Sequence, residues 1–298
     1  MPDFASELRA RLRQIGARPL VVVEGKHDKV ALMQFLDRAT EVLCADGKPR
    51  LLHAYAAIEP HLRNALLFVM DCDGDTPAEY KGQVDLVLTT NRDAEADILL
   101  MLDPATRAGV ELFGPTRSTA DEAIDRMNEV VDRAAVVAAI VGSMLKAARG
   151  RGLKVQRGSG PTARAIELLD FLKPEMVEEL SSVDSVGELV GRIQSVLAWG
   201  IDEAAAVEGD VLLDLGRECR RHRRVNCEGC LIQRSANGHH FVQAIAAMHS
   251  SETRGQYQVA NVAMVLRTAA TYSPLRSWPT LKRIQRWEEM SGYQVLRR

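Results

Sequence analysis

The chain has 298 residues, of which 46% are hydrophobic and 26% are charged, a balance typical of a globular protein with one large or two ordinary domains. Its formal net charge of −2 excludes a protein coated in basic residues, so any binding of a polyanion has to depend on local patches. No run of about 18 apolar residues occurs, and the N-terminus has no apolar stretch of signal-peptide length. We therefore expect a cytoplasmic protein without a membrane span, in which the five cysteines are reduced thiols.

Short apolar runs alternate with helical patterns along the first third of the chain. Strands that alternate with helices predict right-handed crossovers and a mainly parallel sheet, and ligands of such sheets bind beyond the carboxyl ends of the strands. We expect residues 1–105 to form an α/β domain with a mainly parallel sheet flanked by helices. In chain order the expected elements are a strand at 20–24, a helix at 27–39, a strand within 40–50, a helix near 56–65, strands at 66–71 and 84–90, and a helix at 94–102 halted by Asp103–Pro104.

The pattern changes beyond residue 105. Apolar residues spaced three and four apart form a continuous stripe from Ile124 to Ala148, which predicts one long helix. This helix suits the core of a domain as well as the seam of a homodimer. We expect residues 106–298 to form a mostly helical C-terminal region, in which further helical patterns occur at 161–172, 186–199, 239–249 and 258–271.

Carboxylates gather where two of the predicted strands end. Glu24 closes "VVVE", and Asp71 closes "LLFVMD" as the first acid of "DCDGD". On an extended backbone, residues two apart face the same side at about 7 Å, so Asp71 and Asp73 share one space, and Gly74 lets the chain turn Asp75 toward it. These hard oxygen donors suit Mg²⁺ or Mn²⁺. A solvated turn explains the Asp-Gly cluster equally well, but Glu24 at a second strand end favours the metal hypothesis.

The segments "VVVEGKHDKVALMQFL" and "LLFVMDCDGD" together resemble the TOPRIM domain of topoisomerases, bacterial primases and OLD-type nucleases. That family's pattern is a strand ending Glu-Gly, an Asp three residues after the Gly, and a later strand ending Asp-x-Asp. Here these are Glu24–Gly25, Asp28, and Asp71 with Asp73, within residues 18 to about 102. "TTNRDAEADILLML", and more loosely "NGHHFVQAI", extend the resemblance to the compact AriB-like and OLD-type nucleases of anti-phage defence.

The resemblance implies a TOPRIM-like fold and a Mg²⁺-dependent endonuclease that cleaves DNA or RNA as an anti-phage defence effector. It implies that Glu24, Asp71 and Asp73 are catalytic and hold Mg²⁺ or Mn²⁺, with Glu24 as a general acid/base or ligand. Asp75 and Glu95 are then secondary ligands. Because no Walker A pattern occurs, the resemblance also implies a separate ABC-type ATPase partner. The alternative is a non-catalytic TOPRIM-fold regulatory subunit that partners such an ATPase.

Two basic stretches are candidates for contacts with nucleic-acid phosphates. "RECRRHRR" at 217–224 has five arginines, and residues 146–160 have five basic residues and no acid. Each is either a phosphate-binding surface or a solvated face, and an acidic metal site favours the first, because a polyanion must be drawn past the carboxylates. The candidate nucleic-acid-binding residues are Lys26, Arg92, Arg220, Arg221, Arg223 and Arg224.

The sequence "NCEGC" places Cys227 and Cys230 near His222, His239 and His240. A single C-x₂-C pair is half of a zinc ligand set, and these histidines lack the spacing that completes one. We therefore expect an ordinary reduced pair here and not a zinc site.

Overall fold

The computed structural model forms two compact units, Met1–Asp97 with Thr271–Arg298, and Ile98–Ala270. The predicted division differs from this one, because it placed a boundary at residue 105 and assigned the C-terminal residues to the helical region. The structure describes residues 3–16, 18–72, 80, 82–89, 93–99, 102–159, 162–219, 236–253, 255, 258–271 and 278–297.

The first unit is built on a four-stranded, fully parallel sheet with the strand order β2-β1-β3-β4. The expected α/β fold with a mainly parallel sheet is therefore confirmed. The chain passes from β1 outward to β2 and then crosses to β3 and β4, so the direction of winding reverses between β1 and β3. Ligands of doubly wound sheets bind at such a reversal. The strands are β1 (Leu20–Val23), β2 (Glu41–Cys44), β3 (Leu66–Met70) and β4 (Leu86–Leu88).

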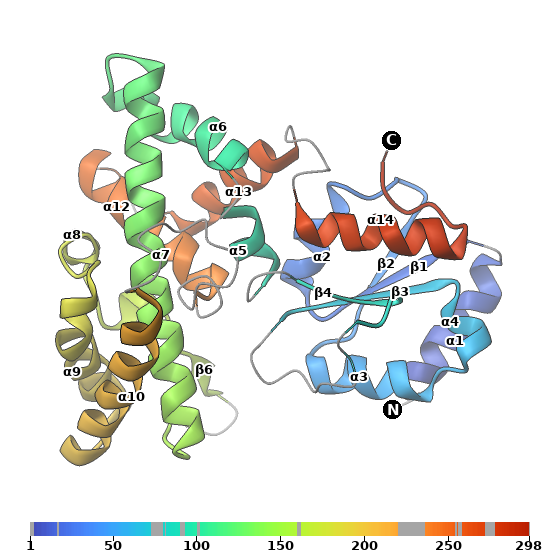
Figure 1. Cartoon of the computed structure of the whole chain (residues 1–298), viewed down its shortest axis with the longest axis horizontal. Coiled ribbons are helices and arrows are strands. Elements are labelled where there is room, and N and C mark those ends of the chain that lie inside the picture. The colour runs from blue at the N-terminus through green and yellow to red at the C-terminus, as the bar shows by residue number, and fades with distance from the viewer. Residues whose placement is uncertain are drawn as a thin grey trace. The chain divides into compact units, whose positions relative to one another are not determined.

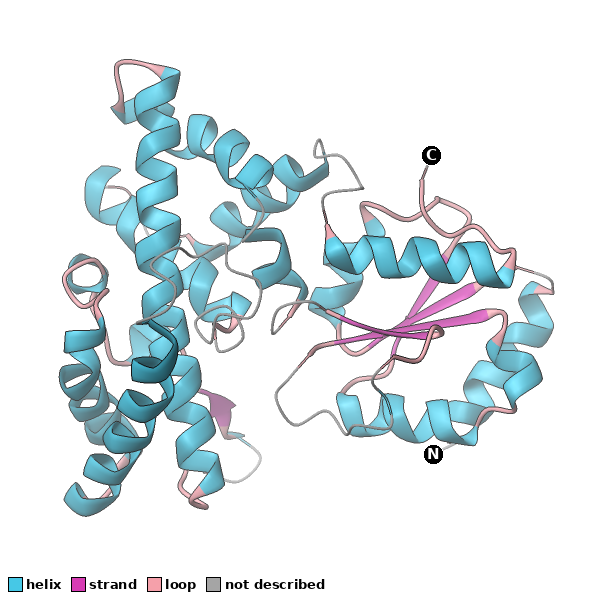
Figure 2. Ribbon diagram, viewed as in Figure 1, coloured by secondary structure: helices cyan, strands magenta, loops and turns pink. Residues whose placement is uncertain are grey.

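Helices cover both faces of this sheet, as Figure 2 shows. One face carries α1 (Phe4–Ile15), α3 (Lys48–Ala57) and α4 (Pro60–Arg63), and the other carries α2 (Lys26–Met33) and α14 (Pro279–Ser291) (Figure 1). Both β1 and β3 are buried along their whole length, which is why they read as uninterrupted apolar runs.

The helix expected near 56–65 is wrong in position. Helix α3 begins at Lys48 and ends at Ala57, and only the single turn of α4 follows. Its start has local causes, since Gly47 takes a positive φ of 122° and Pro49 lies in the first turn, where its missing N–H costs no hydrogen bond.

The C-terminal segment belongs to the first unit because its apolar face is buried there. Helix α14 buries Leu281, Ile284 and Trp287. Arg283 Nη1 donates to the carbonyl oxygen of Leu88 at 2.6 Å, at the end of β4.

The second unit is mostly helical, as expected, and is organised around the 31-residue helix α7. From Met127 to Ala148 the apolar stripe predicted for this helix is buried within the unit and forms its core, whereas Ile124 at its start is only partly buried. None of the helices in the described ranges is long and apolar enough to cross a membrane. The elements are α5 (Ala94–Leu99), which spans the boundary, α6 (Leu102–Phe113), α7 (Ala120–Gly150), α8 (Pro174–Val177), α9 (Val186–Leu197), α10 (Ile201–Cys219), α12 (Gly238–Thr253), α13 (Val259–Thr271) and the antiparallel strands β5 (Gln156–Arg157) and β6 (Arg164–Ala165).

Two predictions in this region are wrong in detail. The helix expected at 161–172 is replaced by β6 and a 3₁₀ turn at Leu168–Asp170, because Asp170 is bound by arginines from both strands of the β5–β6 hairpin. Pro104 also does not end a helical region. It lies in the first turn of α6, a position where proline is tolerated.

Candidate functional site

The structure brings Glu24 and Asp71 together at the carboxyl edge of the sheet. Strands β1 and β3 are neighbours, and Val23 is in register with Val69, so the residues that follow leave the sheet side by side. The main-chain N–H of Asp71 donates to Oε2 of Glu24 at 3.4 Å, and both residues are partly buried. The two strand ends that carry predicted ligands therefore meet where the winding of the sheet reverses.

Short main-chain contacts fix the path of the chain around Glu24. The carbonyl oxygen of Glu24 accepts from Gly47 N at 3.0 Å, which joins the loops after β1 and β2. The N–H of Gly25 donates to the carboxylate of Asp28 at 2.8 Å, so Asp28 has a structural role as the cap of α2. Lys26 is exposed at the first position of the same helix, on the edge that carries Glu24.

Thr89 is a residue of this edge that the sequence pattern did not reveal. It directly follows β4, is 1% exposed, and accepts a hydrogen bond from Cys72 N on its Oγ1 at 2.9 Å. Cys72 lies between Asp71 and Asp73 in the sequence, so a buried hydroxyl contacts the acidic segment directly. The available signal was a threonine pair closing the apolar run "LVL", which is not specific by itself.

Two reactive side chains of the sheet unit, the Cys44 thiol and the Tyr55 hydroxyl, are held in their protonated forms. Burial raises the pKa of the Cys44 thiol, whose Sγ donates to the Gly25 carbonyl at 3.5 Å. Burial and a hydrogen bond to Asp85 raise the pKa of Tyr55 to about 12. Neither group is therefore an ionised nucleophile at neutral pH.

The remaining predicted site residues lie outside what the structure describes. Helix α5 contains the main chain of Glu95, whose side chain is among the parts not described. Among the described residues, no three His, Cys, Asp or Glu side chains gather in a group that could hold a metal ion. The residues that fall entirely outside the described ranges are Asp73, Asp75, Arg92, Arg220, Arg221, Arg223, Arg224, Cys227 and Cys230.

Part of the basic stretch at 146–160 is neutralised by the chain itself. Arg151 pairs with Asp210 at 2.8 Å, and Arg157 pairs with Asp170 at 2.5 Å. For these two arginines the structure favours a role in the fold over a surface reserved for phosphates.

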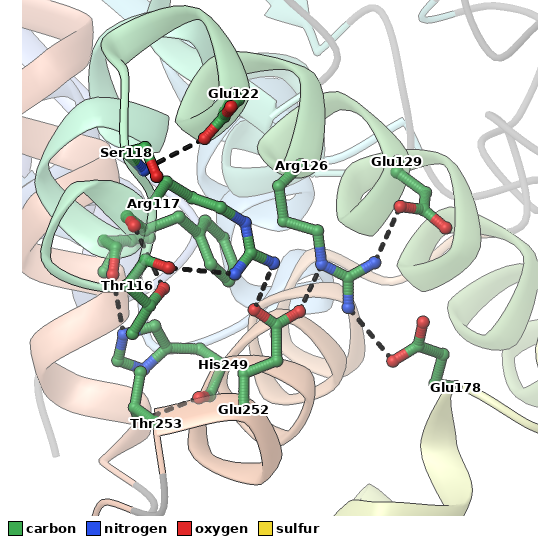
Figure 3. Close-up of polar contacts among 12 residues, drawn as sticks. Thr116, Arg117, Ser118, Glu122, Arg126, Glu129, Glu178, His249, Glu252 and Thr253 are labelled. Carbon is green, nitrogen blue, oxygen red and sulfur yellow. Dashed lines mark hydrogen bonds and ion pairs between the residues drawn. The ribbon is translucent and has the colours of Figure 1, made fainter.

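A second polar cluster lies in the helical unit and is centred on Arg126 of α7 (Figure 3). Its guanidinium binds Glu129 at 2.8 Å, Glu178 at 3.1 Å and the carboxylate of Glu252. Although burial opposes its charge, the hydrogen bonds to these three carboxylates raise the pKa of Arg126. We call this group, which Arg117 and Arg133 complete, the Arg126 cluster. Its three arginines balance its three glutamates, so it ties elements together and has no surplus charge for a ligand.

No family model matches the chain, and no curated protein matches it. A functional assignment therefore depends on the chemistry of the sheet edge. Glu24 and Asp71 supply hard oxygen donors from adjacent strands, the donor class that Mg²⁺ and Mn²⁺ prefer. These two acids match a divalent cation in donor class, and the described residues alone do not complete a ligand set.

Proposed function

We propose that the chain is a Mg²⁺- or Mn²⁺-dependent endonuclease that cleaves phosphodiester bonds in DNA or RNA, acting as an effector of anti-phage defence. The observation that carries this proposal is the meeting of the Glu24 carboxylate with the first residue of the acidic segment, Asp71, at the switch point of a parallel sheet. Carboxylates that gather at such a point repel one another, and a divalent cation bound between them offsets that repulsion.

The roles follow from chemistry and position. Glu24, Asp71 and Asp73 would hold the cation, with Asp75 and Glu95 as outer ligands. A bound divalent ion neutralises charge that develops on the phosphate and lowers the pKa of a bound water. The main-chain contacts at Gly25 and Gly47 keep Glu24 in place, and the exposed Lys26 is positioned to attract the polyanionic substrate.

The test is to change each acid to its amide, because Glu24→Gln and Asp71→Asn keep size while they remove charge. We expect the rate of Mg²⁺-dependent cleavage of plasmid DNA, tRNA and single-stranded oligonucleotides to fall by at least about 100-fold in each variant. Even residues that only hydrogen-bond to a metal ligand contribute about 10- to 100-fold, and a ligand itself contributes more. The matched control is Glu59→Gln. Glu59 pairs with Arg9 at 3.1 Å and precedes β3 in the chain, so it lies near the amino end of that strand and away from the proposed site. This control should cleave at the wild-type rate.

Undiminished cleavage in both amide variants would exclude the proposal. A wild-type chain that cleaves no substrate with Mg²⁺ or Mn²⁺, alone or with an added ABC-type ATPase, would instead favour a non-catalytic regulatory subunit. A measurement of Mn²⁺ binding would then show whether such a non-catalytic chain still binds the metal.

A further inference from the structure

Thr89 occupies a special place in the ladder between β3 and β4. Its main-chain N–H donates to the carbonyl oxygen of Met70 at 3.0 Å, which extends the pairing one residue beyond Leu88. In a parallel ladder the acceptors recur every second residue along each strand. Phe68 N donates to Asp85 O, so the same register makes the carbonyl oxygen of Thr89 the regular acceptor for Cys72 N, four residues further along both strands.

The acceptor that Cys72 N uses is the side-chain Oγ1 of Thr89 and not its carbonyl oxygen. The hydroxyl thus takes the place of the next main-chain acceptor in the ladder. This exchange anchors the exit of β3 at Cys72 through a side chain of the neighbouring strand. Because Thr89 is almost fully buried, water does not readily replace the hydroxyl as a partner.

The exit of β3 is held from both neighbouring strands. Asp71 N donates toward β1, to Glu24 Oε2, and Cys72 N donates toward β4, to Thr89 Oγ1. Consecutive amides of an extended chain point to opposite sides, so the two contacts fix the segment jointly. Of the two acceptors only Thr89 is uncharged, and it can therefore be changed without altering the charge of the site.

We propose that Thr89 is a positioning residue for the acidic segment, one whose hydroxyl fixes the main chain at Cys72, directly after Asp71. The proposal rests on the proposed function, in which Asp71 and Asp73 hold the divalent cation. Residues that orient metal ligands through hydrogen bonds typically contribute 10- to 100-fold to metal affinity. Thr89 acts in this way through its hydrogen bond to the main chain of Cys72.

The experiment measures Mn²⁺ binding to the full chain by electron paramagnetic resonance, together with hydrogen exchange of the Cys72 amide. Thr89→Val keeps the shape of the side chain and removes the acceptor, and Thr89→Ser keeps the hydroxyl. We expect Thr89→Val to weaken Mn²⁺ binding about 10- to 100-fold and to accelerate exchange at Cys72, and Thr89→Ser to restore both. Thr40→Val is the matched control. Thr40 lies just before β2, at the opposite side of the sheet from β4, and its hydroxyl donates to the carbonyl oxygen of Val295 at 3.3 Å.

The outcomes separate this proposal from the one on which it rests. Wild-type affinity for Mn²⁺ in Thr89→Val, together with lost binding in Asp71→Asn, overturns the positioning role and leaves the metal site intact. A wild-type chain that binds no Mn²⁺ overturns both. If Thr89→Val does not fold, as judged by circular dichroism, Thr89→Ala provides a second variant without the hydroxyl. A Cys72 amide that exchanges rapidly in the wild-type chain also overturns the role.

Discussion

Asp97 shows how much one buried carboxylate contributes to the first unit. Only 2% of it is exposed, and its Oδ2 accepts from Trp278 Nε1 at 2.9 Å and from the Thr280 hydroxyl. Asp97→Ala leaves both buried donors without this acceptor, so we expect it to lower the free energy of unfolding by roughly 2–5 kcal/mol. Urea unfolding at pH 7 measures the loss.

The matched control for Asp97 is Asp37→Ala, which changes an exposed acid of the same unit whose carboxylate caps a turn through Ala39 N at 2.8 Å. We expect this change to cost less than about 1 kcal/mol. Equal losses in the two variants would show that the buried hydrogen bonds of Asp97 contribute nothing specific.

Asp170 gives the stability of the second unit a defined pH dependence. Burial works against its charge, but a main-chain hydrogen bond and the guanidinium groups of Arg164 and Arg157 outweigh it and lower its pKa. A lowered folded-state pKa stabilises the fold above the unfolded value of about 3.9, and this stabilisation is lost as pH falls through the folded value. We expect Asp170→Asn to be destabilised relative to wild type at pH 7 and the difference to shrink below about pH 4. Urea unfolding at pH 7, 5 and 3 measures this trend, and a difference independent of pH would contradict it.

At the residue scale, the sequence pattern revealed groups whose signal is local. Glu24 and Asp71 follow buried strands directly, so the strand ends alone placed them at one edge. Thr89 and Asp97 gave no comparable signal, because their roles depend on partners elsewhere in the chain. Asp97 meets partners 181 and 183 residues away. No spacing rule covers such a contact.

Among the elements, α7 shows what the Arg126 cluster adds to a helix whose apolar stripe already fixes its burial. Arg126→Gln removes the guanidinium that joins Glu129, Glu178 and Glu252, and leaves three carboxylates near one another. The Arg126 side chain is 10% exposed, but its partners are between 19% and 47% exposed and remain partly solvated, so we expect a loss of roughly 1–3 kcal/mol. Chemical unfolding of the helical signal measures the loss.

Arg192→Gln is the matched control within the same unit. Arg192 pairs with Glu188 one turn earlier on α9, and both side chains are substantially exposed. Pairs of this kind contribute about 0.3–0.5 kcal/mol. If both arginine variants lost a similarly small amount, the cluster would be an ordinary surface network.

The elements that the sequence predicted best are those whose burial is complete or strictly periodic. The strands β1 and β3 and the helix α7 belong to this group. Helix α14 was missed because only three apolar residues of its 13, Leu281, Ile284 and Trp287, are buried, and their spacing resembles that of many surface segments. The pattern at 161–172 was interpreted as a helix because the spacing of apolar residues carries no information on ion pairs. The pairs of Arg157 and Arg164 with Asp170, which hold the β5–β6 hairpin in place, could therefore not be predicted from it.

The whole molecule is an insertion of one unit into another. The chain leaves the first unit after Asp97 and returns to it at Thr271. Within the first unit the two ends meet, because the Trp278 indole N–H donates to Asp97. The proposed metal site lies in the first unit, to which the C-terminal segment also belongs. Folding experiments can measure how much that segment contributes to the stability of the unit.

Two shortened chains test this organisation. In one, residues 1–99 are joined to 278–298 by a linker of about six Gly and Ser residues, and the other ends at residue 99. The joined chain keeps the buried side chains Leu281, Ile284 and Trp287, each of which stabilises the fold by about 1.5–3 kcal/mol, whereas closing so short a linker costs little. We expect the joined chain to unfold cooperatively in urea, followed by circular dichroism, and the chain that ends at 99 to be unfolded or less stable by several kcal/mol. If both were equally stable, the C-terminal segment would only rest on a sheet unit that is complete without it, and if neither folded, the first unit would depend on the helical one for its stability.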